Sequence, residues 1–211
     1  MTEYLLFANT GFFGDLPRMP IGLTELDCTF TFITGGLTNE NFAGLNNLNY
    51  IVLNQNNIVN SIPTVFGELP SLEFMYAQDT LISGDLAFMD GPGKMPVITQ
   101  LWIDNNPNMG GTLPTTIGTM STLASLSLTV NNLTGTIPSE IGQLGAINMR
   151  ELWLFDNKLV GTIPTEFGNL LKMSIFQVEG NDLTGTMPSA LCNSFVLSIL
   201  GADCAEVTVS I

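Results

Sequence analysis

Acidic side chains are the residues of this chain with the clearest capacity for chemistry. The sequence holds 19 aspartates and glutamates, 5 lysines and arginines, and no histidine. Without histidine, the chain can form neither a histidine-based catalytic triad nor a histidine metal site. Glycoside hydrolysis by two carboxyls about 5 to 10 Å apart is the remaining arrangement to consider. The candidate pairs are Glu25 with Asp27, and Asp104 with Glu151 or Asp156.

The charge balance limits the partners that the chain can attract. A formal net charge of −14 repels nucleic-acid phosphates and anionic membrane surfaces, so neither is expected as a partner. No stretch of about 20 apolar residues is present, so we expect no membrane insertion by this segment. Basic proteins, cations and uncharged glycans remain as partner classes.

The three cysteines divide into a close pair and a distant residue. Cys192 and Cys204 lie near the C-terminus, whereas Cys28 stands far from both. This spacing favours one disulfide, Cys192–Cys204, and one buried thiol, Cys28, with two buried thiols as the alternative to the disulfide. A disulfide would place the protein in an oxidising compartment.

An internal repeat organises these residues. The segments LASLSLTVNNLTGTIPSEIGQL, MRELWLFDNKLVGTIPTEFGNL and MSIFQVEGNDLTGTMPSALC begin at Leu123, Met149 and Met173. They share the skeleton L-x-x-L-x-L-x-x-N-x-L-x-G-x-I-P. The same frame extends back to Leu5 and gives eight repeats with steps of 21 to 27 residues. A period of this length predicts a stacked repeat architecture.

Each repeat has two apolar slots, two residues apart, which alternation along a strand would turn into the core. The slots hold Leu5 and Phe7, Leu26 and Cys28, Ile51 and Leu53, Met75 and Ala77, Leu101 and Ile103, Leu126 and Leu128, Leu152 and Leu154, and Phe176 and Val178. An asparagine then ends the strand in five repeats, where a buried amide can pair with backbone groups of the turn. A stack of such units buries one continuous apolar edge.

The L-T-G-x-I-P skeleton resembles the plant-type leucine-rich repeat. That type occurs in polygalacturonase-inhibiting proteins, plant receptor-kinase ectodomains and secreted algal proteins. The resemblance implies an α/β solenoid, a right-handed superhelix with a concave parallel sheet, a second short strand near L-x-G-x-I and helical turns on the convex side. We expect an array of eight repeats over residues 1–190, without the usual N-terminal cap, and a C-terminal cap over residues 191–211.

Outward strand positions would form the concave surface, which we call the sheet face. They lie one before, one after, and three and four after the first core slot. Both tryptophans, all three tyrosines and seven acids fall there, and no base does. Rigid aromatic side chains are favoured binding anchors, although they also stabilise sheets by cross-strand packing. The candidate ligand-binding residues are Tyr50, Tyr76, Asp79, Trp102, Asp104, Glu151, Trp153 and Asp156.

Trp102 and Trp153 flank a repeat with small outward residues. Ser125, Ser127 and Thr129 predict a low step between the two indoles, about 10 Å wide at two strand spacings. Such a step would suit a protruding side chain or a sugar ring.

Taken together, the pattern predicts a non-catalytic protein-interaction module of a secreted or cell-surface protein. The carboxyl pairs would lie on an open face that does not exclude water, and Asp104–Asn108 lacks the glycine and distal glutamate of a calcium loop. We therefore expect no catalytic residue, metal or cofactor. The partner would be a protein or peptide with basic and apolar features.

Three alternatives stay open. Stacking on tryptophan and tyrosine would also suit cell-wall carbohydrate, and the family resemblance allows inhibition of a wall-degrading enzyme. A threonine ladder would suit ice binding; it consists of Thr112, Thr136, Thr162 and Thr186. Asn132 begins an N-L-T glycosylation sequon, which agrees with an extracellular or cell-surface location.

Overall fold

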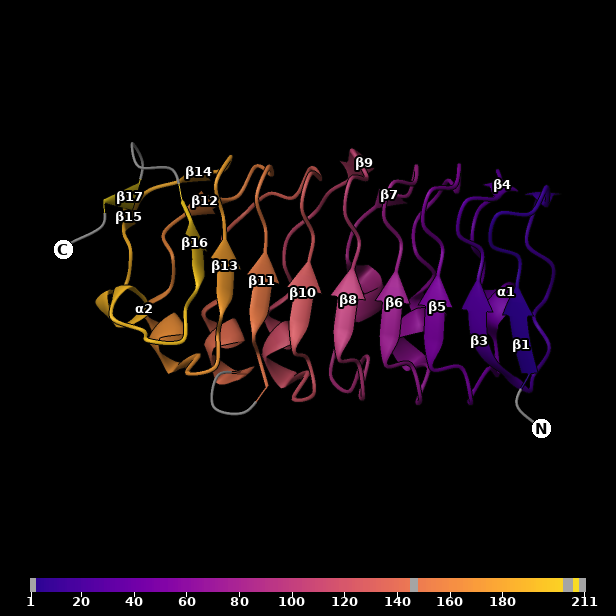
Figure 1. Cartoon of the computed structure of the whole chain (residues 1–211), viewed down its shortest axis with the longest axis horizontal. Coiled ribbons are helices and arrows are strands. Elements are labelled where there is room, and N and C mark those ends of the chain that lie inside the picture. The colour runs from indigo at the N-terminus through magenta and orange to yellow at the C-terminus, as the bar shows by residue number, and fades with distance from the viewer. Residues whose placement is uncertain (1–2, 145–147, 203–206, 209–211) are drawn as a thin grey trace.

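Each repeat contributes one strand to a single parallel sheet. The computed structural model describes residues 3–144, 148–202 and 207–208. These residues form a nine-stranded sheet whose strands follow chain order along the long axis of the molecule (Figure 1). The strands are β1 (Glu3–Leu6), β3 (Leu23–Asp27), β5 (Tyr50–Val52), β6 (Phe74–Tyr76), β8 (Gln100–Trp102), β10 (Ser125–Ser127), β11 (Glu151–Trp153), β13 (Ile175–Gln177) and β16 (Ile199–Gly201). The predicted solenoid is confirmed.

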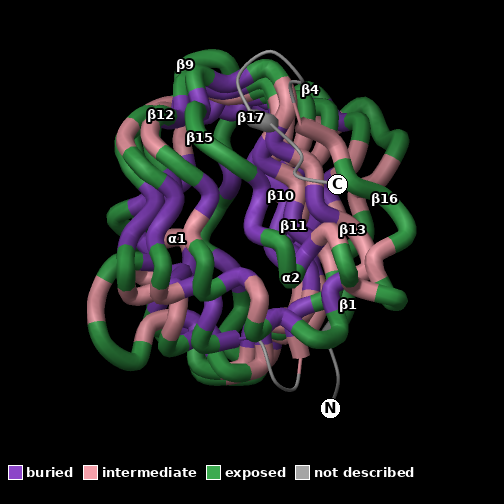
Figure 2. The backbone as a smooth tube through the Cα atoms, turned by 90° about the vertical axis from the view of Figure 1, so that its left-hand side faces the viewer, coloured by how far each residue is buried: buried purple, intermediate pink, exposed green. Residues whose placement is uncertain are grey.

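Short second strands and helical turns complete the repeats. The second strands pair as β2 (Phe13–Gly14) with β4 (Phe32–Ile33), β7 (Ser83–Gly84) with β9 (Asn108–Met109), β12 (Val160–Gly161) with β14 (Asp182–Leu183), and β15 (Gly185–Thr186) with β17 (Val207–Thr208). The helical turns are α1 (Asn39–Phe42), η1 (Thr64–Glu68), η2 (Ala87–Met89), η3 (Thr115–Thr119), η4 (Ser139–Leu144), η5 (Thr165–Asn169) and α2 (Ser189–Cys192). They lie on the side opposite the long sheet, and buried backbone lines the space between (Figure 2).

The core runs along this inner space and is filled by the predicted slots. All sixteen slot residues are buried except Leu5 and Phe7, which are partly buried in the first repeat. Cys28 is a buried free thiol, as predicted. Burial, with a smaller contribution from the charge of Asp27, raises the pKa of Cys28 to about 12. A thiol held in this protonated form acts as a small apolar side chain.

The asparagine after each strand pairs with the backbone as predicted. The Asn157 amide donates to the carbonyls of Leu128 (2.8 Å) and Leu154 (3.1 Å), and its oxygen accepts from the Leu133 N–H (3.0 Å). Asn56, Asn106, Asn131 and Asn181 likewise donate to a carbonyl of the preceding repeat. These bonds tie consecutive repeats together where the strands end, because each asparagine satisfies backbone groups of the repeat before its own.

The sequence prediction placed four outward positions per repeat on the strand, and this was wrong for the last two. Each central strand ends one residue after its first core slot. The fourth outward position adopts a left-handed conformation in every repeat: Asn9, Phe30, Gln55, Asp79, Asn105, Val130, Asp156 and Gly180 have φ between +53° and +69°. A turn therefore follows each strand, although backbone hydrogen bonds between repeats continue into it, as from the Asn105 N–H to the Thr129 carbonyl at 2.9 Å.

The C-terminal segment extends the sheet through β16, which pairs in parallel with β13. Leu197 and Ala202 pack against the core, whereas Leu200 is 38% exposed on the last strand. The predicted Cys192–Cys204 disulfide involves Cys204, which lies outside the described residues, so the disulfide stays a prediction. Among the described residues, Lys94 and Glu68 form the only ion pair, at 2.9 Å. No helix in the described ranges has the length and apolar character to cross a membrane.

Candidate ligand-binding face

Five aromatic side chains form a continuous row on the sheet face. Cross-strand register brings Tyr76 beside Trp102 and Tyr50 beside Phe74. The ring centroids lie 6.0 Å apart for Phe74 and Tyr50, 5.8 Å for Tyr50 and Tyr76, 5.1 Å for Tyr76 and Trp102, and 6.0 Å for Trp102 and Trp153. Each of the five rings is half-buried. We call this set, Phe74, Tyr50, Tyr76, Trp102 and Trp153, the aromatic row.

The indoles of Trp102 and Trp153 contact each other and so fill the low step that the sequence predicted between them. Trp102 and Trp153 meet edge-to-face at an interplanar angle of 85°, across the strand that separates them. The Trp102 Nε1–H donates to the Ser125 hydroxyl at 2.8 Å. Because the small side chains of β10 leave room above them, the indoles lean inward from both sides and cover Ser125 and Ser127, which are buried. The predicted open gap of about 10 Å was therefore wrong.

A smaller hollow of about 260 Å³ lies beside this indole contact. Trp102, Trp153 and Phe155 supply its aromatic walls. Its polar lining comes from Gln78, Asp104, Ser127 and Thr129. We call this site the indole hollow. Its volume lies below the range of about 300 to 1,000 Å³ typical of small-molecule sites, so it suits a single side chain.

A directional hydrogen-bond relay ends on the carboxylate of the hollow. The Asn54 amide donates to Gln78 Oε1 at 3.1 Å, and the Gln78 amide donates to Asp104 Oδ2 at 3.0 Å. From the other side, Asp104 Oδ1 accepts from the Ser127 hydroxyl (2.6 Å) and the Thr129 N–H (2.9 Å). Three neutral donors therefore fix the orientation of Asp104, while its charge has no ion-pair partner among the described residues.

The remaining predicted residues of the sheet face lie outside the hollow. The Tyr76 hydroxyl donates to Gln100 Oε1 at 2.5 Å. Burial raises the pKa values of Tyr50 and Tyr76 above the ordinary value for tyrosine. For Tyr50, a second and smaller cause of the raised pKa is the charge of Asp27. For Tyr76, the second cause is the neighbouring Tyr50. Both phenols therefore stay neutral hydrogen-bonding groups at physiological pH.

The four predicted acids differ in how the fold uses them. Asp104 is held in the relay, and Asp79 accepts from the Asn105 amide at 2.5 Å. Glu151 is half-buried at the start of β11, and Asp156 is exposed in the turn that follows this strand. The structure thus brings Trp102, Asp104 and Trp153 into one site, and it leaves the other acids apart as separate surface charges.

Sequence reasoning placed Ser127 and Thr129 between the two indoles but missed two lining residues of the hollow, Gln78 and Phe155. Both occupied predicted outward positions, so their repeat slots were the available signal. The repeat pattern did not predict the direction in which each side chain points. Gln78 and Phe155 both lie three residues after a first core slot, past the strand end, where the following turn decides which way a side chain points.

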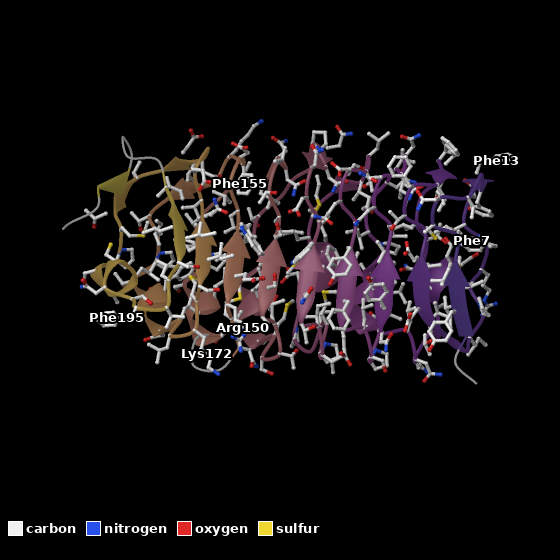
Figure 3. All side chains as sticks on the ribbon, viewed as in Figure 1. Phe7, Phe13, Arg150, Phe155, Lys172 and Phe195 are labelled. Atoms are coloured by element: carbon white, nitrogen blue, oxygen red, sulfur yellow. The ribbon has the colours of Figure 1, made fainter. Side chains whose placement is uncertain are left out.

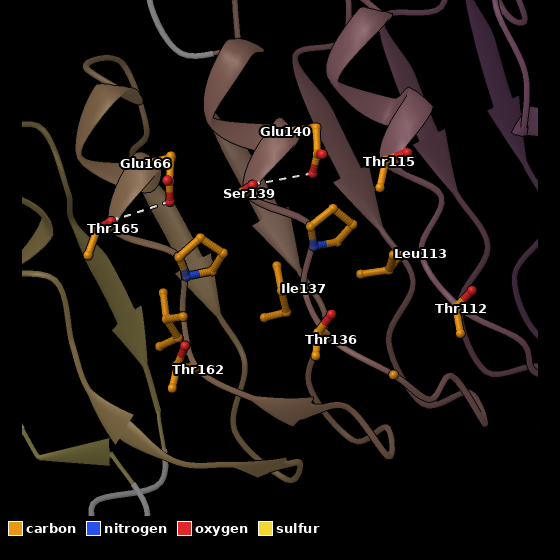
Figure 4. A pocket seen from close by; sticks show the side chains of 14 residues that line it. Thr112, Leu113, Thr115, Thr136, Ile137, Ser139, Glu140, Thr162, Thr165 and Glu166 are labelled. Carbon is orange, nitrogen blue, oxygen red and sulfur yellow. Dashed lines mark hydrogen bonds between the residues drawn. The ribbon is translucent and has the colours of Figure 1, made fainter.

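The threonine ladder belongs to a different surface. Thr112, Thr136 and Thr162 line a groove of about 780 Å³ together with residues at the start of η4 and η5, including Glu140 and Glu166 (Figure 4). We call it the threonine groove. A Cβ placed on Gly135, Gly161 or Gly185 would meet the Cγ2 methyl of the preceding repeat's threonine within about 3 Å, at 2.9, 3.0 and 3.0 Å respectively. The ladder is therefore regular because each methyl packs on a glycine.

These features define the class of protein: a stack of leucine-rich repeats with an aromatic, acidic sheet face. Two family models described as leucine-rich repeat match the chain, one over residues 21–82 and the other over residues 122–144 and 148–170. The chain belongs to the leucine-rich-repeat family, and its repeat is of the plant type. No curated protein sequence matches it.

Solved structures of plant receptor ectodomains share the fold. The ectodomain of the Arabidopsis receptor kinase HAESA, in complex with an N-terminally extended IDA peptide hormone ligand, is 25% identical with a TM-score of 0.82, over 97% of this chain and 34% of that one. The PEPR1–AtPEP1 structure is 22% identical with a TM-score of 0.80, and the match covers 98% of this chain and 35% of that one.

A third similar structure is the ectodomain of the plant membrane receptor kinase GASSHO1/SCHENGEN3 from Arabidopsis thaliana, in complex with CASPARIAN STRIP INTEGRITY FACTOR 2. It is 22% identical with a TM-score of 0.77, over 97% of this chain and 24% of that one. The chain thus spans between 24% and 35% of the length of these three receptors.

Proposed function

We propose that this chain is a non-catalytic recognition module that binds a protein or peptide on its sheet face. The observation that carries the proposal is the aromatic row. Five half-buried rings in mutual contact offer a large, rigid surface whose ordering cost is already met in the free protein. The same face carries seven acids and no base in its outward slots. A partner with apolar and basic features complements both properties.

The similar receptors support this assignment. HAESA is in complex with a peptide hormone ligand, and GASSHO1/SCHENGEN3 is in complex with an integrity factor. By analogy with such membrane receptor kinases, the module belongs to an extracellular or cell-surface protein. An extracellular address also agrees with the predicted Cys192–Cys204 disulfide and with the sequon at Asn132.

Geometry supports a role in binding rather than catalysis. The hollow of the sheet face holds about 260 Å³ and one carboxylate, Asp104. Acid–base hydrolysis needs a second carboxyl at about 5 to 10 Å with a suitably tuned pKa. The other predicted candidates, Glu151 and Asp156, do not line this hollow.

Affinity capture from the secreted and cell-wall fraction of the source organism tests the proposal. The bait is compared with Trp102→Ala/Trp153→Ala, which removes the two indoles at one end of the aromatic row. A matched control is Phe13→Ala/Phe32→Ala, which removes two exposed aromatic rings from the second strands. We expect a protein that wild type and the control retain and the tryptophan variant does not. Equal retention by all three baits would contradict the proposal, once circular dichroism shows that each is folded.

Salt and temperature separate the rival functions. A charged protein partner dissociates faster as salt rises, whereas a neutral cell-wall glycan stacked on tryptophan does not. Inhibition of a wall-degrading enzyme would appear as a retained protein with hydrolase activity. Ice binding would give thermal hysteresis that Thr136→Lys abolishes and the tryptophan variant preserves, because Thr136 lies in the threonine groove.

A further inference from the structure

We propose that the indole hollow is a subsite for an arginine side chain of the partner. This proposal rests on the proposed function, because it names the chemistry of one contact on the same face. Three features of the hollow support it: an unpaired negative charge, aromatic walls and a volume that holds one side chain.

Charge complementarity is the first argument. Asp104 lines the hollow and makes no ion pair within the described residues. The nearest base in sequence to β11, Arg150, lies at the opposite end of that strand from Phe155, a wall of the hollow (Figure 3). A cationic group entering the hollow therefore meets one fixed negative charge, and the chain's net charge of −14 steers it there.

The relay prepares Asp104 for such a group. An ionised carboxylate has about four acceptor positions, and Gln78, Ser127 and Thr129 occupy three of them. The remaining position is on Oδ2, which accepts only from Gln78. One N–H of a ligand can thus bond to Asp104 without displacing any donor of the protein. Because the donors already fix the carboxylate, binding costs little ordering entropy.

The aromatic walls favour a planar cation. Two indoles and the Phe155 ring surround the hollow, and tryptophan is the strongest aromatic partner for a cation. A guanidinium stacks on aromatic faces and is more weakly hydrated than an ammonium, so it loses less hydration on entry. Arginine can use one N–H on Asp104 and its plane on an indole, whereas lysine offers a compact, strongly hydrated charge. We therefore expect arginine to bind more tightly than lysine.

Intrinsic fluorescence gives a direct test, because Trp102 and Trp153 are the only tryptophans of the chain and both line the hollow. The probe is N-acetyl-arginine methylamide, and its neutral isostere is N-acetyl-citrulline methylamide, titrated at constant ionic strength. We expect a saturable change with arginine at a Kd on the order of 10 mM, a weaker one with the lysine analogue, and none with citrulline.

Matched variants locate the contact. Asp104→Asn keeps an acceptor for Ser127 and Thr129 but removes the charge, and it should weaken arginine binding at least fivefold. Asp27→Asn is the control, since Asp27 is also a sheet-face acid that accepts from a backbone N–H, at 2.8 Å from Thr29. It should leave binding unchanged. Phe155→Leu, which removes an aromatic wall and keeps an apolar side chain, gives a second measurement if Asp104→Asn unfolds.

The two proposals fail in different ways. No saturable change with arginine up to about 50 mM, or an equal response to citrulline, overturns the arginine subsite. So does equal binding by wild type and both hollow variants. If a captured partner still depends on the tryptophans but not on Asp104, the recognition module stands and the arginine subsite falls. If the tryptophan variant captures the same partners as wild type, the proposed function itself falls, whatever the fluorescence titration shows.

Discussion

The sheet face and the threonine groove are built from the same repeats, yet one is irregular and the other is nearly uniform. Along the sheet face, successive outward positions hold Tyr76, Trp102, Ser127 and Trp153 in one cross-strand row. Along the groove, Thr112, Thr136 and Thr162 occupy one slot in consecutive repeats. The threonines are exposed, whereas the three sheet-face aromatic rings are half-buried and Ser127 is buried, so the more uniform surface is the more exposed one and burial does not explain its regularity.

Backbone geometry explains it better. In the groove, each threonine methyl packs on a glycine whose φ is positive, so the slot is constrained by the neighbouring repeat. On the sheet face, the side chain stands away from the backbone and contacts other side chains. Its identity is free to vary as long as the neighbours accommodate it. Regular slots therefore maintain the stack, and irregular ones are available for recognition.

The largest effect is expected at a regular, buried slot. Asn157→Ala removes one acceptor and one amide donor, and it leaves the Leu128 carbonyl and the Leu133 N–H without their partner, whereas the Leu154 carbonyl keeps its bond from the Asn181 amide. We expect a loss of about 3 to 5 kcal/mol in the free energy of unfolding, measured by urea titration. The control Asn47→Ala, at an exposed asparagine, should change it by less than about 0.5 kcal/mol. Similar values for both variants would contradict the structural role of this slot.

A smaller loss is expected at the glycine slot of the groove. Gly161 has φ +86°, and a Cβ there would meet Thr136 Cγ2 at 3.0 Å. Gly161→Ala should therefore cost about 2 kcal/mol in thermal or urea unfolding. Gly11 has an ordinary φ and open space around it, so Gly11→Ala should be neutral to within about 0.5 kcal/mol. A neutral Gly161→Ala would mean that the ladder is not held by this contact.

Coupling within the aromatic row should be measurable but modest. A double-mutant cycle with Trp102→Leu and Trp153→Leu is expected to give about 1 kcal/mol of coupling in unfolding experiments, because the rings meet edge-to-face at 6.0 Å. The same cycle with Trp153 and Tyr4, on the first strand, should give none. If the tryptophan pair also shows no coupling, the indoles do not close over β10 in solution.

The smallest effect should be a gain. Val130 occupies the left-handed slot with φ +54° and is 38% exposed, and β-branched residues rarely adopt this conformation. Val130→Asn should raise the free energy of unfolding by about 0.5 to 1 kcal/mol, since asparagine tolerates the left-handed region. Val196→Asn, at an exposed valine without a positive φ, controls for the change in polarity and should bring no gain.

The fold was predictable from the sequence because its determinants are local and repeated. The slots of Leu126 and Leu128 recur in every repeat, and Asn157 marks the strand end where the structure places it. Positive φ at Gly161 also follows from the repeat pattern. Any one of these signals would be weak alone, but the same pattern recurs along the chain.

The binding site was predictable only as a face. Alternation placed Trp102, Asp104 and Trp153 on one side of the sheet, yet the indole contact depends on two side chains leaning across β10 from separate repeats. The relay from Asn54 through Gln78 likewise depends on amide orientations set by neighbours about 25 positions away. Contacts between irregular positions are not encoded by a period, so they emerged only in three dimensions.

The scarcity of positive charge has a consequence for how the protein responds to its surroundings. With a net charge of −14 and a single ion pair, Lys94–Glu68, in the described part of the chain, the folded molecule repels itself. Added electrolyte screens that repulsion and should raise the melting temperature. The same screening weakens attraction to a basic partner. Ionic strength should therefore change the thermal stability of the protein and its affinity for a basic partner in opposite directions. The salt concentration that best protects the fold is the one at which the complex is weakest.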